Sequence, residues 1–594
     1  MRLDVETGAG TRPIDLFSLL APEDEERAHE DAYLWIKAMR ALHVDGEPFR
    51  SRFTLRGDSL WWFAELYLHK EQAIHQAIRV VRAFDVLVAR ERPRAVRAAG
   101  GRHAPVVAAA ADARGVAYTG PRWRGLDPSL VRIDARAVRL AAAARVSRIR
   151  TRPPNQASAA VAAFIHRAFW RTGHGDGSAE SYIGLILRAL ETRLDPGGIR
   201  YVGVGPRTNF RARRWWDALS AGEIDAVVAI ERFAPYSAMD GSREVYRRRH
   251  ETRRSLWDSA ALRAHAVIAG VDCWPLVREQ LAGIALLQFP WSARAMDEAA
   301  AALRAIEPDV AVTYAEAGGW GRALALEARR AAVPLAGLQH GFIYRHWLNY
   351  RHEPDEVASD PRNAQDRGFP FPDRTLVFDE YTAAHLRQAG RFPEAALAVT
   401  GSASQDALAA AVRALGPDDI AKARHESGAD GSRAFLLFAA KEREARGALP
   451  ALVEAVRGMP DVQLAIKPHP AETPDVYRDA TAGAANIRVL PGGTPLPPLL
   501  GAARGVVTVN STVAVDALAL GVPSLVIGLP NNLTPFVQAG AMLGAGSAAE
   551  IREALARLLY DQKFRSKFHP GRPAGSGRAA EASADAIMAL RQRS

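Results

Sequence analysis

A lysine and a histidine that lie between prolines are the first residues whose types and spacing suggest chemistry. They occur in Lys467-Pro468-His469-Pro470, directly after an apolar run typical of a buried strand. The prolines restrict the backbone on both sides of His469 and remove two N–H donors, so the imidazole is held at the strand end. A cationic imidazole beside the Lys467 ammonium suits a diphosphate or phosphodiester leaving group. We therefore predict a phosphate site here, with a purely structural turn as the alternative.

A second candidate anion site is Asn510-Ser511-Thr512, which precedes an expected helix over residues 513–520. Ser511 or Thr512 can cap that helix. The same hydroxyls, together with the free N–H groups of the first helical turn, can bind a phosphate. Asp516 follows one helical turn after Thr512, on a face from which its carboxylate could reach a ribose.

Two strand ends in the first part of the chain carry further candidates. Gln339, His340 and Gly341 follow an expected strand over residues 334–338, and the glycine allows a tight turn. The His340 imidazole could stabilise a phosphate or orient an acceptor hydroxyl, or only bond within the turn. Glu316 follows another expected strand and precedes a Gly-Gly pair. Its carboxylate could act as a general base, or serve only at the start of a helix, where the dipole favours it.

The segment after Gly341 is dense in aromatic and basic side chains, with Tyr344, Arg345 and His346 at its start. Aromatic side chains in a loop need a surface to cover, so we predict a binding loop. No CxxC, HExxH or Walker-type sequence occurs, so neither a metal site nor a P-loop is predicted. The single cysteine, Cys273, cannot form an internal disulfide and fits a reducing compartment.

Alternating strand and helix patterns must position these residues. One series runs over residues 198–378 and a second over residues 434–527, which predicts two mostly parallel sheets. Such sheets bind ligands at the carboxyl ends of their strands, where the candidate residues lie. The predicted fold is α/β. It comprises a helical N-terminal extension (1–90), a first Rossmann-like domain (91–400) with a helical insertion (about 125–195), a connector (401–432), a second Rossmann-like domain (433–575) and a C-terminal helix (576–594).

Composition limits the class of protein. The 594 residues are 48% hydrophobic and 24% charged, which is ordinary for a globular protein and excludes a disordered, collagenous or disulfide-scaffold chain. The net charge is +11 with the two signs mixed along the sequence, so we expect anionic ligands or an anionic membrane surface and no nucleic acid. No signal-peptide pattern and no apolar run long enough to cross a membrane occur. We expect a cytoplasmic protein, at most peripheral on the inner face of the cytoplasmic membrane.

Two segments each allow two interpretations. The aromatic cluster Leu60-Trp61-Trp62-Phe63 either packs inside a helical hairpin or exposes an aromatic face to a lipid-linked acceptor. An arginine-rich helical segment is either a solvated helix face or a patch for anionic lipid head groups. Its arginines are Arg132, Arg136, Arg139, Arg145, Arg148 and Arg150.

In the order and spacing of these motifs, the chain resembles the GT-B glycosyltransferases that build bacterial surface polysaccharides. The likeness is to capsule-type transferases that use CMP-activated Kdo or sialic acid, with kinship to the CDP-glycerol glycerophosphotransferases of teichoic acid synthesis. It covers roughly residues 300–530 and rests on Gln339-His340-Gly341, Val399-Thr400-Gly401-Ser402 with Asp406, Lys467-Pro468-His469-Pro470, and Asn510-Ser511-Thr512 through Gly521-Val522-Pro523.

The resemblance implies two Rossmann-like domains that face each other across a cleft, the first for the acceptor and the second for the nucleotide-sugar donor. The nucleotide sugar is a substrate, and neither a cofactor nor a metal is implied. The acceptor is a polysaccharide or glycolipid hydroxyl. In such families the histidine of the His-Pro pair and the hydroxyls before the last helix hold the donor phosphate, which implies those roles for His469, Ser511 and Thr512. A carboxylate of the N-terminal domain is the base, a role carried over to Glu316.

The predicted site thus has three parts. The catalytic set is Glu316, His340 and His469; the donor-phosphate set is Lys467, His469, Asn510, Ser511, Thr512 and Asp516; the acceptor or cleft loop is Gln339, Gly341, Tyr344, Arg345 and His346. Other classes stay open. A UDP-N-acetylhexosamine 2-epimerase has the same two-domain plan and needs no acceptor. A glycerophosphotransferase would break a phosphoanhydride bond and leave CMP. A nucleotide- or lipid-binding protein would show no turnover.

Overall fold

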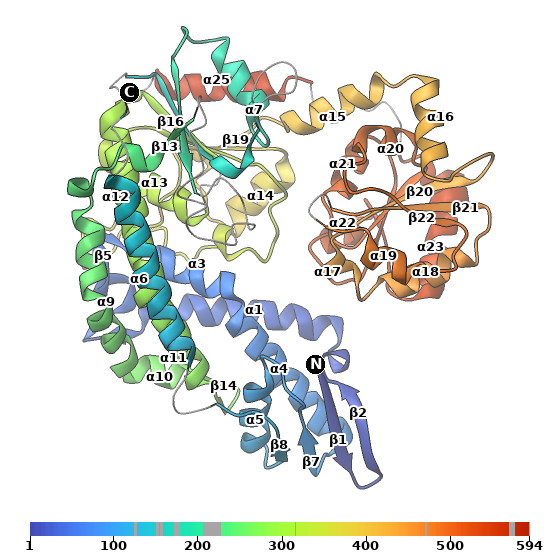
Figure 1. Cartoon of the computed structure of the whole chain (residues 1–594), viewed down its shortest axis with the longest axis horizontal. Coiled ribbons are helices and arrows are strands. Elements are labelled where there is room, and N and C mark those ends of the chain that lie inside the picture. The colour runs from blue at the N-terminus through green and yellow to red at the C-terminus, as the bar shows by residue number, and fades with distance from the viewer. Residues whose placement is uncertain are drawn as a thin grey trace. The chain divides into compact units, whose positions relative to one another are not determined.

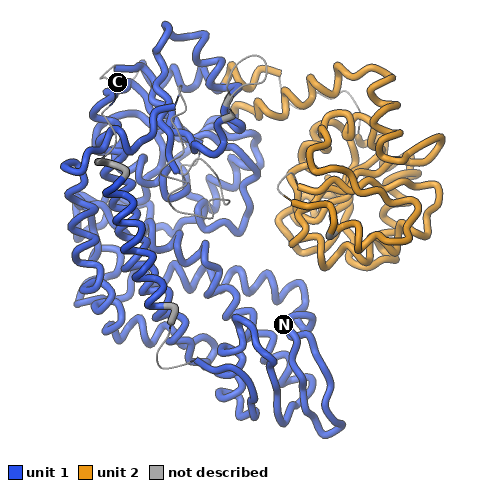
Figure 2. Tube along the Cα trace, in the orientation of Figure 1, with its two compact units in different colours: residues 1–399, 583–594 blue, residues 400–582 orange. Residues whose placement is uncertain are grey.

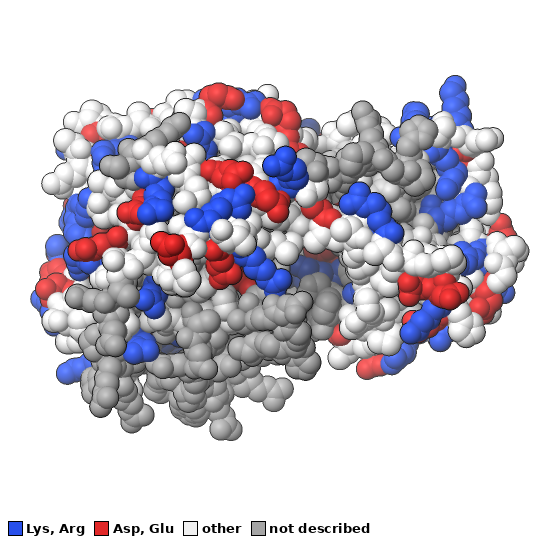
Figure 3. Space-filling view, turned by 90° about the horizontal axis from the view of Figure 1, so that it is seen from above, with Lys and Arg blue, Asp and Glu red and all other residues white. Residues whose placement is uncertain are grey.

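The computed structural model describes residues 1–123, 128–149, 154, 158–171, 179–205, 227–314, 317–469, 472–568 and 577–592 (Figure 1). The chain forms two compact units (Figure 2). Unit 1 consists of Met1–Val399 and Ser583–Ser594, and unit 2 of Thr400–Ala582. Each unit is built around a parallel sheet of its own. On the face shown in Figure 3, acidic and basic side chains are interspersed, as the mixed charges of the sequence predict.

The large sheet of unit 1 has seven parallel strands in the order β13-β12-β9-β16-β17-β18-β19. Their bounds are β9 (Val161–His166), β12 (Ile199–Val204), β13 (Val228–Ala229), β16 (Val310–Thr313), β17 (Leu335–Leu338), β18 (Arg374–Val377) and β19 (Leu397–Val399). The strand that comes first in the chain, β9, is an inner strand, third in this order. The chain adds β12 and β13 on one side of it and then returns to β16 on the other. This reversal creates a switch point at the carboxyl ends of β9 and β16, where such sheets bind ligands.

The inner strand β9 corrects a prediction, because the sequence led us to expect a helix through this segment. All five residues from Val161 to Ile165 are buried, since β9 has a strand on each side and helices over the sheet. A strand buried on both faces shows a continuous apolar run and no alternation, which a buried helix shows as well. The predicted helical insertion therefore contains α6 (Pro128–Ile149) and α7 (Gly184–Glu191), with β9 between them.

Helices α12 (Phe289–Ile306) and α13 (Gly319–Ala331) cover one face of this sheet. Side chains such as Ala302, Leu303 and Leu324 pack there against Phe164 of β9. Helix α14 (Glu380–Gln388) follows β18 and packs its buried Ala383 and Leu386 with Val377 of that strand. Near the end of the chain lies α25 (Ala579–Arg591), where a C-terminal helix was predicted. The Arg591 guanidinium pairs with the Asp309 carboxylate at 2.7 Å.

The first 120 residues form a second, smaller sheet, which corrects the expectation that residues 1–90 are all helical. Its strands are β1 (Arg2–Thr7), β2 (Gly10–Asp15), β7 (Ala95–Arg97) and β8 (Ala117–Thr119), in the order β2-β1-β7-β8. In β1, buried Leu3 and Val5 alternate with exposed residues, the pattern of a half-buried strand that the sequence analysis overlooked. Helix α5 (Ala104–Ala113) links β7 to β8. These two strands therefore belong to the small sheet, whereas the sequence led us to place them in the first Rossmann-like domain.

Helices α1 (Pro22–Ala38), α3 (Trp61–Glu71) and α4 (Ala73–Glu91) join this small sheet in one hydrophobic core. Trp61, Trp62 and Phe63 are fully buried in it. The packed interpretation of this aromatic cluster is confirmed, and an exposed aromatic face for a lipid-linked acceptor is wrong.

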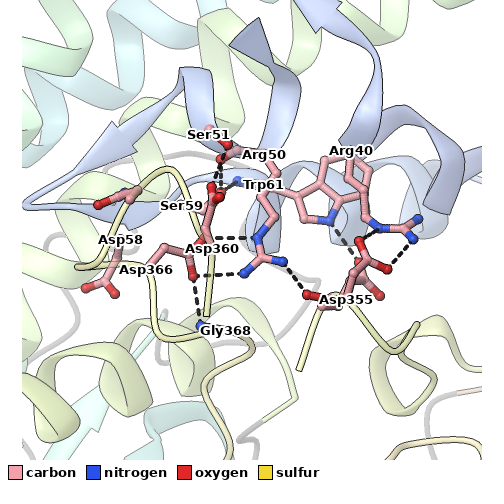
Figure 4. Close-up of polar contacts among 12 residues, drawn as sticks. Arg40, Arg50, Ser51, Asp58, Ser59, Trp61, Asp355, Asp360, Asp366 and Gly368 are labelled. Atoms are coloured by element: carbon pink, nitrogen blue, oxygen red, sulfur yellow. Dashed lines mark hydrogen bonds and ion pairs between the residues drawn. The ribbon is translucent and has the colours of Figure 1, made fainter. Parts of the chain in front are cut away.

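Buried ion pairs connect α1 and the short helix α2 (Phe49–Arg52) to residues 355–368, which lie between β17 and β18 (Figure 4). The Arg50 guanidinium donates to the Asp366 carboxylate at 3.0 and 3.2 Å and to the Asp355 carbonyl at 2.6 Å. The Lys37 ammonium lies 2.5 Å from the Glu65 carboxylate and 2.7 Å from that of Glu356. Since removal of one partner would strand a buried charge, these pairs make the N-terminal segment an integral part of unit 1.

The sheet of unit 2 has six parallel strands in the order β22-β21-β20-β23-β24-β25. Their bounds are β20 (Ala434–Ala439), β21 (Val462–Lys467), β22 (Ile487–Val489), β23 (Gly505–Thr508), β24 (Ser524–Ile527) and β25 (Leu543–Ala545). This is the strand order of the Rossmann fold, with its switch point between β20 and β23. Helices α18 (Leu449–Arg457) and α23 (Ala548–Tyr560) cover one face, and α20 (Leu496–Ala502) and α21 (Val513–Ala519) the other.

The predicted connector contains α15 (Ala403–Arg413) and α16 (Pro417–Glu426). Across the described ranges of both units, no helix combines the length and apolar character that crossing a membrane requires.

Candidate functional site

Thr508, the last residue of β23, lies at the switch point of unit 2. Its hydroxyl is fully buried, donates to the Ala439 carbonyl at 2.6 Å and accepts from the Ser511 N–H at 3.0 Å. The first bond joins β23 to the end of β20. The second fixes the turn that carries Asn510, Ser511 and Thr512. Thr508 was absent from the predicted site, because a threonine inside an apolar strand reads as ordinary strand sequence.

Three basic side chains gather at the ends of β20 and β21. Lys467 ends β21, is half-buried and donates to the Gly492 carbonyl at 3.3 Å; burial lowers the pKa of its ammonium. His469 follows two residues later and is exposed. Lys441, which sequence reasoning missed, comes two residues after β20 and is also exposed. Its position after the first strand of the unit was the signal that could have found it.

The charges of these lysines act on the imidazole. Burial lowers the pKa of His469 most, Lys441 lowers it further, and Lys467 adds a smaller effect in the same direction against Glu472. The imidazole is therefore neutral at pH 7 in the absence of a ligand. The cationic form was predicted beside a phosphate, and it stays a prediction. A neutral imidazole still donates one N–H to a phosphate oxygen, while the lysines supply the positive charge.

Glu472 holds the two loops that carry these groups. Its carboxylate accepts from the Glu442 N–H at 3.0 and 3.2 Å and from the Tyr477 hydroxyl at 3.3 Å. The Tyr477 hydroxyl also donates to the Ala440 carbonyl at 3.0 Å. The loop after β20 is thereby attached to the loop after β21, on either side of Lys441. The Glu472 carboxylate thus has structural partners within the protein.

The residues after β23 contribute hydroxyls and an amide. The Ser511 hydroxyl accepts from the Val513 N–H at 3.3 Å, whereas the N-cap residue Thr512 is exposed and makes no side-chain cap bond. The Asn510 Oδ1 atom is buried and has no hydrogen-bond partner among the described residues. A buried acceptor of this kind calls for a donor from outside the protein, such as a ligand hydroxyl. Helix α21 has only seven residues, so the lysines carry more of the anion attraction than its dipole does.

Asp516 lies on α21, where its Oδ1 accepts from the Gln405 amide at 3.2 Å. Burial raises the pKa of its carboxyl group to about 6. Its assignment to a ribose stays a prediction. No group of three or more His, Cys, Asp or Glu side chains in the described ranges has the arrangement of a metal site.

A second cluster lies at the switch point of unit 1. The backbone N–H of His166, the last residue of β9, donates to the Tyr314 hydroxyl at 2.9 Å. The ring of His340, which follows β17, lies 5.2 Å from the Tyr314 ring and 5.3 Å from the Tyr182 ring between centroids. Burial lowers the pKa of His340, and its imidazole also hydrogen-bonds to the Tyr314 backbone. His340 is therefore a neutral imidazole in an aromatic surrounding.

Glu180 is the carboxylate of this cluster. It is 3% exposed, and its Oε2 accepts from the backbone N–H groups of Tyr182 at 2.7 Å and Ile183 at 2.5 Å. Burial raises its pKa, and the nearby Tyr314 hydroxyl lowers that pKa to a smaller extent. Sequence reasoning missed His166, Glu180, Tyr182 and Tyr314, because it placed helix where β9 lies and so could not locate the switch point. The predicted base, Glu316, lies outside the described residues.

The remaining predicted residues have partners within unit 1. The Gln339 amide donates to the Gly341 carbonyl at 2.9 Å and accepts from the Phe378 N–H at 2.8 Å, so it fixes the turn after β17 against the end of β18. A Cβ on Gly341 would meet open space, and its φ is not in the left-handed region, so a close approach does not require this glycine. Tyr344 packs its ring 4.8 Å from that of Trp347.

The basic side chains of the predicted loop meet α1. The Arg345 guanidinium pairs with the Glu26 carboxylate at 2.6 Å. The His346 ring stacks on that of His29 at 4.5 Å. These contacts give the loop a packing role, and its predicted role in acceptor binding is not tested by them.

No protein-family model and no curated protein matches the sequence. Solved structures do resemble the fold. A UDP-GlcNAc 2-epimerase from Neisseria meningitidis bound to UDP-GlcNAc is 14% identical with a TM-score of 0.44, covering 73% of this chain and 99% of that one. A UDP-GlcNAc 2-epimerase from Methanocaldococcus jannaschii is 15% identical with a TM-score of 0.42, covering 72% and 99%. A glycosyltransferase from Rickettsia africae is 10% identical with a TM-score of 0.33, covering 50% and 78%. At TM-scores below 0.5, these likenesses assign neither a family nor an activity to the chain.

Proposed function

We propose that the chain is a GT-B glycosyltransferase that moves a sugar from a nucleotide-activated donor to a hydroxyl of a bacterial surface polysaccharide or glycolipid. The observation that carries the proposal is the basic group Lys441, Lys467 and His469 at the ends of the adjacent strands β20 and β21. The neighbouring strand β23 is followed by Asn510, whose buried amide oxygen has no hydrogen-bond partner among the described residues. The motif resemblance favours a CMP-activated sugar as the donor. The protein acts in the cytoplasm, at the inner face of the cytoplasmic membrane.

Unit 2 serves the leaving group in this proposal. As the bond between the anomeric carbon and the phosphate oxygen breaks, negative charge grows on the nucleotide phosphate. Lys441 and Lys467 offset that charge, and His469 donates a hydrogen bond to a phosphate oxygen. Because Thr508 and Glu472 fix the loops in advance, the donors need no reorganisation as the charge develops. No step of this sequence is assigned to a metal ion.

Unit 1 supplies the base. The acceptor hydroxyl gives its proton to a carboxylate of this unit and its oxygen forms the new bond to the anomeric carbon. Glu316 is the base that the resemblance implies. Glu180 is the carboxylate that lies beside Tyr314 at the switch point, and its raised pKa brings it nearer the working pH of a base. Replacing the true base by glutamine should lower donor turnover about 100-fold or more without loss of nucleotide affinity.

The test is a thermal-shift screen of the whole chain against CMP, CDP, UDP, GDP and their sugar conjugates. A ligand at about 100 times its Kd stabilises the folded state by about 2.7 kcal/mol, which moves the melting temperature visibly. We expect a shift with one nucleotide class that is lost in Lys441→Ala and in His469→Ala. The matched control is Lys422→Ala, which removes an exposed lysine of α16 on the same unit. No shift with any nucleotide contradicts the proposal. A UDP-GlcNAc turnover without any acceptor would replace it by a 2-epimerase.

A further inference from the structure

Unit 1 contains a cavity of about 370 Å³ that the candidate site does not use. It lies between α6, the N-terminal part of α9 (Asp240–Asp258) with the turn before it, and the start of α12 with the π-helical turn Ile284–Gln288. Its volume is in the range of pockets that bind small molecules. The cavity is therefore large enough to bind a small-molecule ligand.

The wall of the cavity is mainly apolar. Helix α6 contributes Ala137, Ala141 and Ala144, whose spacing places them along one face of the helix. Small side chains on that face leave room opposite Leu286 and Leu287. Such a surface excludes a hydrated polyanion and suits a hydrocarbon chain.

Apolar side chains also surround the cavity at the protein surface. Val138, Leu140 and Tyr236 line it and remain 48%, 38% and 40% exposed. They are among the large hydrophobic residues that are exposed in the described structure, and all three line the same cavity. Exposed apolar side chains gathered around a concave site indicate a binding surface.

Three arginines line the same cavity. The guanidinium groups of Arg145 and Arg243 lie 5.4 and 4.8 Å from the centroid of the Tyr236 ring. Arg243 pairs with Asp240, and the Arg294 Nε lies 3.7 Å from a Glu298 carboxylate oxygen. For Arg145 the described residues provide no carboxylate within 4.0 Å. The cavity thus combines an apolar interior with an excess of positive charge.

We propose that this cavity binds the hydrocarbon chain of an anionic, phosphate-bearing lipid, with the phosphate held by Arg145 beside Arg243 and Arg294. The chain gains from burial against the alanine face of α6, and the head group gains from guanidinium hydrogen bonds, which suit phosphate. An uncharged apolar ligand would make no ion pair with the arginines, and free phosphate would bury none of the apolar wall. The site is in unit 1 and does not depend on the donor site proposed for unit 2.

The test uses dodecyl phosphate below its micelle concentration, so that a single chain and a single phosphate are offered without a membrane. Calorimetry on the whole chain measures its affinity, with inorganic phosphate and dodecyl maltoside as the probes that lack the chain and the charge. We expect dodecyl phosphate to bind at least tenfold more tightly than either. Ala141→Phe, which fills the cavity, should weaken binding at least tenfold, and so should Arg145→Glu. Arg132→Glu, an exposed arginine of the same helix outside the cavity, should leave it unchanged.

Arg145 is exposed, so its variant decides the test if Ala141→Phe fails to fold. Equal binding by the wild type and Arg145→Glu overturns the proposal, and so does dodecyl maltoside binding as tight as that of dodecyl phosphate. Flotation with phosphatidylcholine vesicles that contain phosphatidylglycerol separates a lipid site from general adsorption. A further outcome is that Arg145→Glu and Arg132→Glu weaken vesicle binding equally while dodecyl phosphate does not bind. The arginines would then act as a charged surface, and the proposed lipid site in the cavity would be overturned.

Discussion

Replacing Thr508 by valine tests the architecture of the unit 2 site directly. Valine has nearly the same shape but no hydroxyl, so the Ala439 carbonyl and the Ser511 N–H both lose their partner. Each unsatisfied buried group costs about 1–3 kcal/mol. Because the Ser511 N–H is only partly buried, we expect a loss of about 2–4 kcal/mol in local stability at the ends of β20 and β23.

Thr508→Ser is the matched control. It keeps the hydroxyl with both of its hydrogen bonds and removes one methyl group, which costs about 0.8 kcal/mol. Serine should therefore preserve the turn that carries Asn510 and Ser511, although it packs less well. The two variants separate the effect of the hydrogen bonds from that of core packing.

Hydrogen–deuterium exchange on the whole chain measures this effect without assigning a melting transition to either unit. A loss of 2 kcal/mol corresponds to exchange of the Ser511 amide about 30-fold faster, because 1.4 kcal/mol is tenfold. Peptides covering residues 434–440 and 505–513 should change in Thr508→Val and stay near wild type in Thr508→Ser. Under the proposed function, nucleotide affinity should fall in the valine variant alone. If both variants exchange at the same rate, the hydroxyl does not hold the turn and the reasoning is refuted.

Three further predictions concern charge. Lys37→Met should destabilise the protein by about 3–5 kcal/mol in chemical denaturation, because it removes the lysine partner of the buried Glu356 carboxylate and leaves Glu65 with Arg322. Lys422→Met, at an exposed pair, should cost less than about 1 kcal/mol, and equal costs would contradict the buried ion-pair account. Burial lowers the pKa of His75 and of His346 to about 3 in the folded protein, whereas a histidine in the unfolded chain has a pKa of about 6.5. As the pH drops below about 6.5, the unfolded chain takes up protons that the folded protein does not bind, so the free energy of unfolding should fall. The loss is about 1 kcal/mol per histidine at pH 5.5, and a denaturation midpoint that stays constant between pH 7.5 and 5.5 would refute it. A bound phosphate should raise the lowered pKa of His469, so nucleotide binding near pH 6 should take up protons in calorimetry with two buffers; the same uptake in His469→Ala would exclude this histidine as its source.

The sequence predicted what depends on local pattern. Lys467 and His469 follow a strand that is apolar and bounded by prolines, and the structure has β21 end at Lys467. The inner strand β9 was not predictable in this way, because a strand and a helix show the same continuous apolar run when they are buried on all sides. The missed strand affected more of the prediction than the six residues of β9. Without β9 the switch point of unit 1 had no location, so Glu180 and Tyr314 could not be recognised as neighbours of His340.

Lys441 shows a different limit of sequence reasoning. It stands in a short loop with acidic and basic neighbours, the composition of an ordinary solvated turn. Only the order of strands places this loop beside the end of β21, where its charge lowers the pKa of His469. The partners of Arg345 and His346 on α1 depend likewise on contacts between residues more than 300 positions apart. Local pattern carries no information about such contacts.

In both units, a side-chain hydroxyl joins the two strands that flank the switch point, although the residues differ. In unit 2, the Thr508 hydroxyl at the end of β23 bonds to the last backbone carbonyl of β20. In unit 1, the Tyr314 hydroxyl just after β16 accepts from the last backbone N–H of β9. In each case a side-chain hydroxyl joins the two strands that flank the switch point, where no ladder partner remains beyond the strand ends. Loops that leave such a fixed pair of strands start from defined positions, so in unit 2 the loop that carries Lys441 and the turn that carries Asn510 and Ser511 are held before any ligand binds. Preorganisation of this kind is what charge stabilisation in a transfer reaction requires.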